Sequence, residues 1–297
     1  MITVVGGTGR LGRLVTARLL AEGRPVRVVA RSAPGTPVDG AQFVPADVRR
    51  PTSLPPALAG SSVVVSAVHG MAPDGGESPT EVDRDGNRNL VNAACDAGAD
   101  IVLVSLVGAR EDHPMELFRM KAAAEAALLE AASARGARWT IVRATAFADM
   151  WLDLLRGTSR RSGVPTVMGP GRNPVNFVAV DDVAVAVARA ATDPSLRGQV
   201  IEVAGQDLST TALADLVTAP GKHPAHIPTP VVWAVGNALR PLRPGLARVA
   251  RQTLAMERVP MRADPSPGHA QHPWLPLTPI SALVAGTASR AGAVDLP

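Results

Sequence analysis

The sequence predicts an α/β protein with a doubly wound parallel sheet, and two observations lead to this fold class. Short aliphatic runs alternate with helical patterns over residues 1–205, and these runs are nearly continuous in apolar residues rather than alternating with polar ones. Strands of that kind are buried on both faces by helices, as in a parallel sheet. Hydrophobic residues make up 46% of the 297 residues, so the chain can form a large core and is not disordered.

Each expected strand is a short apolar run. The runs cover Ile2 to Val5, Val26 to Ala30, Gln42 to Pro45, Ser62 to Val68, Ile101 to Val107, Trp139 to Arg143 and Val200 to Val203. Helical patterns separate most of them, over Arg10 to Leu20, Thr52 to Leu58, Asp83 to Ala97 and Met115 to Ala134. A strand, a helix and a second strand in this order form a parallel βαβ unit. The pattern therefore predicts a sheet covered on both faces.

Beyond Phe147 the alternation weakens. Residues 160–176 are rich in glycine and proline and predict a loop. The apolar run Phe177 to Val180 predicts a strand, and Asp181 and Asp182 predict the start of a helix, because acidic side chains favour the positive end of the helix dipole.

Prolines become frequent from Ala219 onward, which predicts a small, irregular lobe on the substrate side of the molecule. We expect a nucleotide-binding domain over residues 1–205 and the C-terminal lobe over residues 206–297. Residues 151–176 are expected to lie partly in that lobe.

Composition excludes several classes of protein. Lys and Arg number 30 against 26 Asp and Glu, and the aromatic content is 3%. The arginines are scattered, so neither a basic patch nor a stacking platform for nucleic acid is expected. The longest uncharged apolar stretch is about half of the roughly 18 residues that a membrane-spanning helix needs. The chain also enters its first strand at Ile2 without a basic leader, and we expect no membrane association or secretion.

The residues that commonly bind metals or form disulfides are few. Cys95 is the only cysteine, which excludes a disulfide framework and a cysteine-based zinc site and suits a cytoplasmic protein. His223 and His226 form one H-x-x-H pair, and His269 and His272 form another. Both pairs lie among prolines without a carboxylate at a useful spacing, so no metal site is expected.

A glycine-rich turn between the first strand and the first helix is the strongest functional signal. Residues 7–12 read Gly-Thr-Gly-Arg-Leu-Gly and fit G-x-G-x-x-G. Glycine permits a sharp turn, close approach of backbone amides to a pyrophosphate, and close packing of the helix on the sheet. The helix N-terminus supplies aligned N–H groups for the phosphates. The expected cofactor-binding residues here are Gly6, Thr8, Gly9, Arg10, Leu11 and Gly12 in a Rossmann-like fold.

The end of the second strand distinguishes two cofactors. NAD enzymes place an acidic residue about 20 residues after the glycine turn to bind the ribose hydroxyl. Here Val26 to Ala30 leads into Arg31, which suits the 2′-phosphate of NADP through charge-assisted hydrogen bonds. Arg10 is a second candidate for that phosphate, and both arginines also fit solvated surface positions. The sequence therefore predicts NADP(H) over NAD(H).

Over residues 1–205 the sequence resembles the NmrA-like, atypical branch of the short-chain dehydrogenase/reductase superfamily. The resemblance rests on six segments: Val4 to Gly12, Val28 to Arg31, Pro45 to Val48, Lys121 to Glu125, Trp139 to Arg143 and Phe177 to Ala184. It implies that Asp47 and Val48 border the adenine, and that Ala67 and His69 border the middle of the cofactor. It places Lys121 at the nicotinamide ribose. Asp47 equally fits a plain turn residue, and His69 a solvent-facing loop residue.

The chain departs from the superfamily at the catalytic residues. Most members use a Tyr-x-x-x-Lys pair, but the position four residues before Lys121 is Leu117, and the chain contains no tyrosine. A mechanism that uses a phenol as the acid is therefore excluded. Ser105 stands one or two places before the position of the superfamily's serine, so it does not clearly replace it.

Three roles remain open for Lys121: a ribose clamp, a general acid whose pKa is lowered by burial, and a solvated helix residue. The first functional hypothesis is an NADPH-dependent reductase of a small organic substrate, with Lys121 as its catalytic residue. The alternative is a non-catalytic NADP-binding sensor of the NmrA type, which would report redox state to a partner protein. The missing tyrosine fits both.

Overall fold

The computed structural model describes residues 1–33, 38–71, 77–238, 242 and 244–291. The chain divides into two compact units. The first comprises residues 1–144 and 183–203, and the second comprises residues 145–182 and 204–297. The second unit begins at Thr145, a few residues before the stretch 151–176 that we expected to contribute to the lobe. The last residues of the expected C-terminal lobe, 292–297, lie outside the described part of the chain.

A seven-stranded parallel sheet forms the centre of the first unit, with strand order β10-β6-β5-β4-β1-β2-β3. Its strands are β1 (Ile2–Val5), β2 (Val26–Ala30), β3 (Gln42–Pro45), β4 (Val63–Ser66), β5 (Asp100–Leu106), β6 (Trp139–Ala144) and β10 (Gln199–Val203). β1 and β4 are buried along their whole length. The predicted fold class is confirmed.

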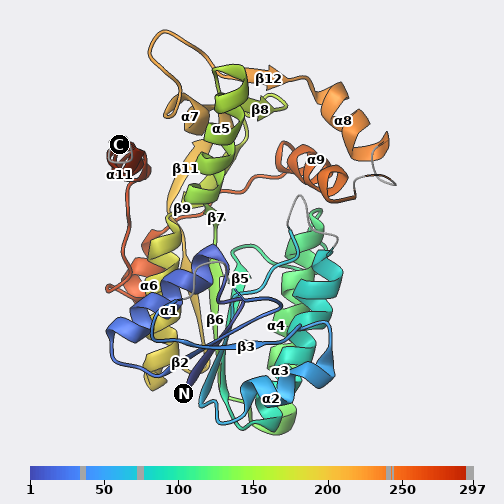
Figure 1. Ribbon diagram of the computed structural model, residues 1–297. Helices are drawn as coiled ribbons and strands as arrows, with labels where there is room; N and C mark the ends of the chain where they lie inside the picture. Colours follow the sequence, from blue (N-terminus) through green and yellow to red (C-terminus); the bar gives the residue numbers. More distant parts are fainter. Residues whose placement is uncertain (34–37, 72–76, 239–241, 243, 292–297) are drawn as a thin grey trace. The chain divides into compact units, whose positions relative to one another are not determined.

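Helices cover both faces of this sheet (Figure 1). α1 (Arg10–Ala21) and α6 (Val180–Thr192) lie on one side, and α2 (Leu54–Leu58), α3 (Asn87–Asp96) and α4 (Glu116–Arg135) lie on the other. Short 3-10 helices occur at η1 (Pro51–Ser53) and η3 (Pro194–Leu196). The largest fully buried side chains of this unit come from both helices and strands: Leu19, Leu54, Leu58, Leu90, Ile101, Leu103, Leu128, Ile141 and Ile201.

β1 lies between β4 and β2, so the connections that leave its carboxyl end and that of β4 run in opposite directions along the sheet. In open parallel sheets, ligands bind at the carboxyl ends of the strands at such a switch point. The glycine turn follows β1 and residues 67–70 follow β4. The topology therefore brings these two loops together.

A π-helical segment, η2 (Thr80–Gly86), precedes α3 without a break. Sequence patterning predicted an α-helix over Asp83 to Ala97, and the structure corrects this, because residues 80–86 are wound with the wider i to i+5 hydrogen bonding of a π-helix. Such segments are rare and occur often at functional sites. Asp83 lies in this segment and is fully buried.

The second unit combines small sheets with helices. The strands β7 (Ala146–Phe147), β9 (Pro174–Val178) and β11 (Gln206–Ser209) form a three-stranded sheet, and β8 (Thr166–Met168) pairs with β12 (Ala225–Ile227). Its helices are α5 (Ala148–Ser162), α7 (Thr210–Asp215), α8 (Thr229–Ala238), α9 (Pro244–Met256), α10 (Ser266–Gln271) and α11 (Ile280–Ala291).

Buried polar side chains join distant segments of the second unit. The Asn176 amide donates to the Gly205 carbonyl at 3.2 Å, the Asp207 carboxylate at 2.7 Å and the Ala263 carbonyl at 2.9 Å. Its oxygen accepts the Gly205 N–H at 2.7 Å. Asp182 accepts the hydroxyl of Thr278 at 2.6 Å and its N–H at 2.8 Å.

Two secondary-structure predictions for this unit were wrong. Residues 160–176 do not form a loop, because they contain the end of α5, the whole of β8 and the start of β9. The proline-rich tail is more helical than expected, because its prolines lie where helices begin: Pro244 starts α9, and proline also occupies the first turn of α10. Proline is tolerated at such positions because the first N–H groups of a helix have no partner within it.

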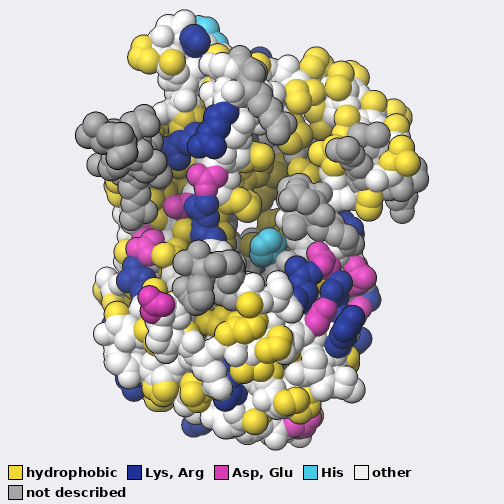
Figure 2. All heavy atoms as spheres, viewed as in Figure 1, with side chains coloured by type: hydrophobic (Ala, Val, Ile, Leu, Met, Phe, Trp, Pro, Cys, Tyr) yellow, Lys and Arg dark blue, Asp and Glu magenta, His cyan; other side chains and the backbone are white. Residues whose placement is uncertain are grey.

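The surface of the second unit includes apolar side chains on and beside α8. Val231 is 50% exposed, Trp233 61% and Leu242 79%. Figure 2 shows hydrophobic side chains gathered over α8 and α9.

Within the described residues, none of the helices has the length and apolar character to cross a membrane. The same part of the chain holds no group of three or more His, Cys, Asp or Glu residues arranged for a metal ion.

Candidate functional site

The glycine turn after β1 is packed too tightly to hold side chains at three of its positions. Gly6 has a φ of +81°, and a Cβ placed there would lie 2.7 Å from the Ala67 carbonyl oxygen. A Cβ on Gly7 would lie 2.8 Å from Val28, and one on Gly12 would lie 2.3 Å from the Gly6 carbonyl oxygen. These glycines let the turn, α1 and the loop after β4 approach one another.

Gly9 differs from the other glycines of the turn. A Cβ there would meet only the Gly6 carbonyl oxygen, at 3.3 Å, and the backbone has an ordinary φ of −74°. Gly9 is the N-cap of α1, and neither a capping side chain nor an acidic residue occupies the first helical turn. In the described part of the chain, no side chain therefore caps the first N–H groups of α1. This cradle fits a pyrophosphate, which helix N-termini bind through such groups.

The other predicted residues of the turn contribute in different ways. Leu11 is 7% exposed and packs in the core, so only its backbone is available to a ligand. The Thr8 carbonyl accepts a hydrogen bond from Arg13 Nε at 3.1 Å. Arg10 is exposed at the start of α1. The pyrophosphate would therefore contact mainly backbone atoms here.

Four charged side chains meet beyond the carboxyl ends of β2 and β3. Arg31 follows β2, while Asp47 and Arg49 follow β3, and the two strands pair in register up to Ala30 and Pro45. Arg49 donates to both oxygens of Asp47, with Nη2 at 2.6 Å from Oδ2. Glu77 pairs with Arg31 and lies 3.7 Å from Arg49 Nη1. We call these residues the arginine cluster.

The electrostatics of the cluster affect Asp47 most. The hydrogen bonds from Arg49 lower the pKa of Asp47 below its ordinary value, against the opposing effect of partial burial. The Asp47 carbonyl also accepts the Arg50 N–H at 2.8 Å, so the residue forms a turn. Asp47 remains ionised and fixes the orientation of Arg49.

Val48 is 7% exposed and belongs to the hydrophobic core of the first unit. Its carbonyl accepts a hydrogen bond from Asn89 at 2.9 Å, and its side chain contacts Gly86, where a Cβ would lie 2.6 Å away. These contacts hold the chain after β3 against η2 and α3. They leave little of the Val48 side chain available for an adenine.

The loop after β4 is held by a buried ion pair. Lys121 on α4 lies 3.0 Å from Asp83 Oδ1, and their side chains are 5% and 0% exposed. Lys121 Nζ donates to the carbonyl oxygens of Val68 and Val104, both at 3.0 Å. Asp83 Oδ2 accepts the Gly70 N–H at 2.8 Å. The interpretation of Lys121 as a solvated helix residue is therefore wrong.

Lys121 Nζ has three oxygen neighbours at 3.0 Å, the Val68 and Val104 carbonyls and Asp83 Oδ1. Two of its three N–H groups bind carbonyl oxygens, whereas Asp83 Oδ1 lies at ion-pair distance but has no hydrogen-bond partner among the described residues. Asn87 continues the polar network by donating to the Asp83 carbonyl at 2.8 Å and accepting the Ser66 hydroxyl at 2.5 Å. The ends of β4 and β5 therefore carry a connected polar cluster.

Ala67 and His69 lie in the same loop. The Ala67 N–H donates to the Val5 carbonyl at 2.9 Å, which places Ala67 beside the glycine turn. The His69 side chain is solvent-exposed, and its Nδ1 accepts the Met71 N–H at 3.3 Å. Surrounding protein desolvates the ring and lowers its pKa below the ordinary histidine value. Because the ring still has access to water, we expect this lowering to be limited.

Ser105 does not replace the missing hydroxyl of the superfamily. It lies within β5, is 1% exposed, and its Oγ has no hydrogen-bond partner among the described residues. A side chain buried inside the sheet cannot reach a substrate.

Sequence reasoning missed Arg49, Glu77 and Asp83. Arg49 carried a weak signal, since it follows Asp47 by two residues at the end of a predicted strand. Glu77 and Asp83 carried none, because their partners Arg31 and Lys121 lie far away in the sequence.

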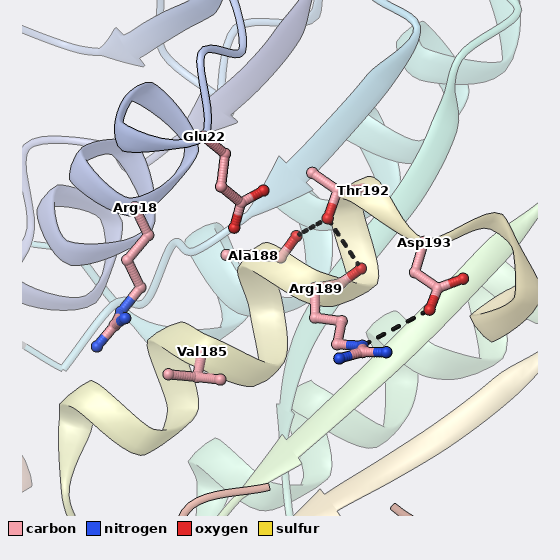
Figure 3. Close-up of a pocket in the computed structure, with 7 residues that line it drawn as sticks. All are labelled: Arg18, Glu22, Val185, Ala188, Arg189, Thr192 and Asp193. Atoms are coloured by element: carbon pink, nitrogen blue, oxygen red, sulfur yellow. Dashed lines mark hydrogen bonds and ion pairs between the residues drawn. The ribbon is translucent and has the colours of Figure 1, made fainter. Parts of the chain in front are cut away.

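The first unit also contains a cavity of about 320 Å³ that does not belong to this site. Figure 3 shows its lining: Arg18 and Glu22 from the end of α1, and Val185, Ala188, Arg189, Thr192 and Asp193 from α6 and the residue after it. Arg189 pairs with Asp193 at 3.6 Å. The cavity lies at the end of α1 opposite the glycine turn, away from the carboxyl ends of the strands.

The parallel sheet, the switch point beside β1 and the glycine cradle at the N-terminus of α1 define a dinucleotide-binding protein of the Rossmann type. Residues 6–194 match the family described as NAD(P)H-binding, and the chain belongs to that family. This agrees with the resemblance to atypical short-chain dehydrogenases/reductases and confirms it.

Known proteins share this sequence or fold. The chain is 29% identical to the NAD(P)H azoreductase of Xenophilus azovorans over 230 residues, which cover 75% of each protein. Its fold is similar to that of the Citrobacter sp. triphenylmethane reductase complexed with NADP(H), with a TM-score of 0.75, 22% identity, and coverage of 96% and 99%. The Escherichia coli NADPH-dependent quinone oxidoreductase complexed with NADPH gives a TM-score of 0.73, 21% identity, and coverage of 97% and 99%. At these identities the two structures establish a shared fold.

Proposed function

We propose that the protein is an NADPH-dependent reductase of a small, conjugated organic substrate. The observation that carries the cofactor choice is the pair of guanidinium groups, Arg31 and Arg49, beyond the ends of β2 and β3. Guanidinium groups bind phosphate oxygens through paired, charge-assisted hydrogen bonds. Sequence similarity to an NAD(P)H azoreductase over three quarters of both chains supports reductase activity.

The absence of tyrosine restricts the substrate class. Reduction of a simple ketone needs an acid beside the developing alkoxide, and no phenol is present to supply it. A conjugated, electron-poor acceptor makes no such demand. A quinone that receives a hydride from NADPH becomes a stabilised anion that takes its proton from water, and a cationic dye becomes neutral without any proton. The names of the three similar proteins fit this class.

The roles of the chain's own residues follow from their positions. When bound, the nicotinamide supplies the hydride. The first-turn amides of α1 face the pyrophosphate, the arginine cluster faces the adenosine 2′-phosphate, and Asp47 and Val48 border the adenine through their backbone. Ala67 and His69 border the middle of the cofactor. The chain thus acts mainly by positioning the donor and the acceptor.

We assign Lys121 the role of holding the nicotinamide ribose rather than that of a general acid. The polar cluster that it forms with Val68, Val104 and Asp83 lies at the ends of β4 and β5, beside the loop that we assign to the middle of the cofactor. A general acid must reach the substrate, whereas the Lys121 side chain is 5% exposed.

A turnover screen tests the proposal. Oxidation of NADPH is followed at 340 nm with four acceptors: a naphthoquinone, a cationic triphenylmethane dye, an azo dye and a simple ketone. We expect turnover with at least one conjugated acceptor and none with the ketone. Turnover of the cationic dye should be independent of pH between about pH 6 and 8, since no protein acid takes part. Turnover of the ketone alone would contradict the substrate class.

A second candidate is a non-catalytic sensor that binds NADPH and reports redox state to a partner protein. The lack of tyrosine together with the burial of Lys121 and Ser105 favours it, because none of these positions offers a proton donor that reaches the substrate. Tight NADPH binding without oxidation by any acceptor would support the sensor. Co-purification under oxidising and reducing conditions would then seek the partner.

A further inference from the structure

One carboxylate oxygen of Glu77 is shared by the two guanidinium groups of the arginine cluster. Glu77 Oε1 pairs with Arg31 Nη1 and lies 3.7 Å from Arg49 Nη1. The Glu77 side chain is 18% exposed, whereas those of Arg31 and Arg49 are 57% and 33% exposed. A single anionic oxygen placed between two guanidinium groups has the contacts that a phosphate oxygen would make there.

The geometry of Arg49 separates its two acidic partners. Nε and Nη2 bind Asp47, with contacts of 2.6 to 3.1 Å, and the backbone N–H of Arg49 also donates to that carboxylate at 3.0 Å. Only Nη1 faces Glu77. Release of Glu77 would therefore leave Arg49 oriented by Asp47, with Nη1 free to bind another anion.

The charges of the cluster determine what can bind. Within the cluster, Arg31 and Arg49 are balanced by Asp47 and Glu77, and Glu81 acts on Arg49 as a further negative charge. A phosphate monoester carries about −1.5 to −2 charges at neutral pH, and Glu77 would repel it if it bound beside Arg31 and Arg49. Without Glu77, two guanidinium groups face one firmly paired carboxylate, and the cluster is positive.

We propose that the Glu77 carboxylate occupies the place of the cofactor's 2′-phosphate, and that Arg31 and Arg49 exchange one for the other when NADPH binds. The inference rests on the proposed NADPH-binding function. It makes Arg49 a second ligand of the 2′-phosphate and Glu77 a residue that sets the preference between NADPH and NADH. NADH carries no 2′-phosphate and leaves the Glu77 pair in place.

Binding titrations with Glu77→Gln test the exchange. A partly exposed ion pair contributes up to about 1 kcal/mol, so removing the competing charge should lower the Kd for NADPH by up to about five-fold. The Kd for NADH should change by less than about two-fold, because NADH does not displace Glu77. Calorimetry with each cofactor measures both values without any need for turnover.

Glu22→Gln is the matched control for the loss of one negative charge. Glu22 is exposed at the end of α1 opposite the glycine turn, and the helix of 12 residues separates it from the site by about 18 Å, beyond one Debye length at physiological salt. In Glu22→Gln, the ratio of the Kd for NADPH to the Kd for NADH should match that of the wild type. An equal gain in NADPH affinity in Glu77→Gln and Glu22→Gln would refute the exchange, since a general charge effect would then explain the gain.

A second variant separates Glu77's effect on the arginines from a structural effect. In an Arg31→Gln background, Glu77→Gln should improve NADPH binding by less than about two-fold, because one of the two competing pairs is already absent. The full gain in that background would overturn the proposal. Wild-type protein that binds neither cofactor would refute both the proposed function and the exchange. Wild-type binding of NADPH with an unchanged ratio in Glu77→Gln would refute the exchange alone.

Discussion

The two units of the chain are stabilised in different ways. In the first unit, β1 and β4 are buried over their full length, and the largest buried side chains are aliphatic residues that fill both faces of one parallel sheet. In the second unit the strands are short, and β11 and β12 are partly exposed. There, Asn176 and Asp182 join segments that are distant in sequence through hydrogen bonds.

This difference separates non-directional from directional stabilisation. Apolar burial depends on the area removed from water, so it tolerates changes that keep volume and pattern. A buried amide that binds three acceptors needs each of them in place, because an unsatisfied polar group inside a protein is costly. We therefore expect single polar substitutions to matter more in the second unit, with one exception in the first.

The exception is the buried pair of Lys121 and Asp83, and it should give the largest effect. Lys121→Met leaves the fully buried Asp83 carboxylate without its cation, which typically costs about 3 to 5 kcal/mol of unfolding free energy. Urea denaturation measures this loss. Lys222→Met is the control, because Lys222 is the only other lysine and is exposed. A loss below about 1 kcal/mol would show that the pair is not needed for the fold.

The second-largest effect should follow from Asn176→Ala in the second unit. The substitution leaves the Gly205 N–H and two carbonyl groups without their buried partner, and a loss of about 2 to 4 kcal/mol is expected. Asn237→Ala provides a control in the same unit, since Asn237 is exposed and, among the described residues, its amide bonds to the Trp233 carbonyl. Equal losses in the two variants would remove the contrast between the units.

The glycine turn offers a test within the apolar first unit. Gly12→Ala places a Cβ 2.3 Å from a carbonyl oxygen and should destabilise the cofactor-free protein by about 1 to 3 kcal/mol. Gly9→Ala should cost much less stability, because its Cβ would lie 3.3 Å from the Gly6 carbonyl oxygen, but it should weaken NADPH binding by placing a methyl group at the N-terminus of α1. Thermal unfolding and cofactor titration distinguish the two. A severe loss of stability in Gly9→Ala would make that glycine structural.

The smallest effect should be a pH dependence shared by both units. Desolvation lowers the pKa of His113 in the first unit and of His272 in the second, and both side chains are buried. As pH falls below about 6.5, the unfolded chain binds protons that the folded protein excludes, so the free energy of unfolding decreases. His272→Gln should flatten the Tm profile between about pH 5 and 7.5. His223→Gln, the exposed control, should leave the Tm profile unchanged. An identical dependence of Tm on pH in the two variants would reject His272 as a contributor.

The parts of the fold that depend on apolar pattern could be predicted from the sequence. The runs Ile2–Val5, Val26–Ala30 and Gln42–Pro45 coincide with β1, β2 and β3, because strands of a parallel sheet are largely apolar, although β3 lies at the sheet edge and is partly exposed. α5 was not predicted, and the Gly and Pro content of residues 160–176 concealed β8 and the start of β9. Strands this short have no periodicity to detect.

The candidate site divides in the same way. The glycine turn was predictable because its whole function lies in contiguous residues. Glu77 and Asp83 were not, because the pairs Arg31–Glu77 and Asp83–Lys121 join residues far apart in the chain. Contacts of that kind leave no local pattern. They exist only once the strands have brought their carboxyl ends together.

The π-helical segment Thr80–Gly86 makes chain length, rather than residue type, a constraint on the site. In a helix each residue adds about 100° of rotation, so removing one residue between 84 and 86 would convert the segment to α-helix and turn Asp83 relative to α3 by about that angle. Asp83 would then point away from Lys121, although both residues would still be present in the sequence. Relatives of this protein should therefore vary in sequence at η2 while avoiding single-residue insertions and deletions there.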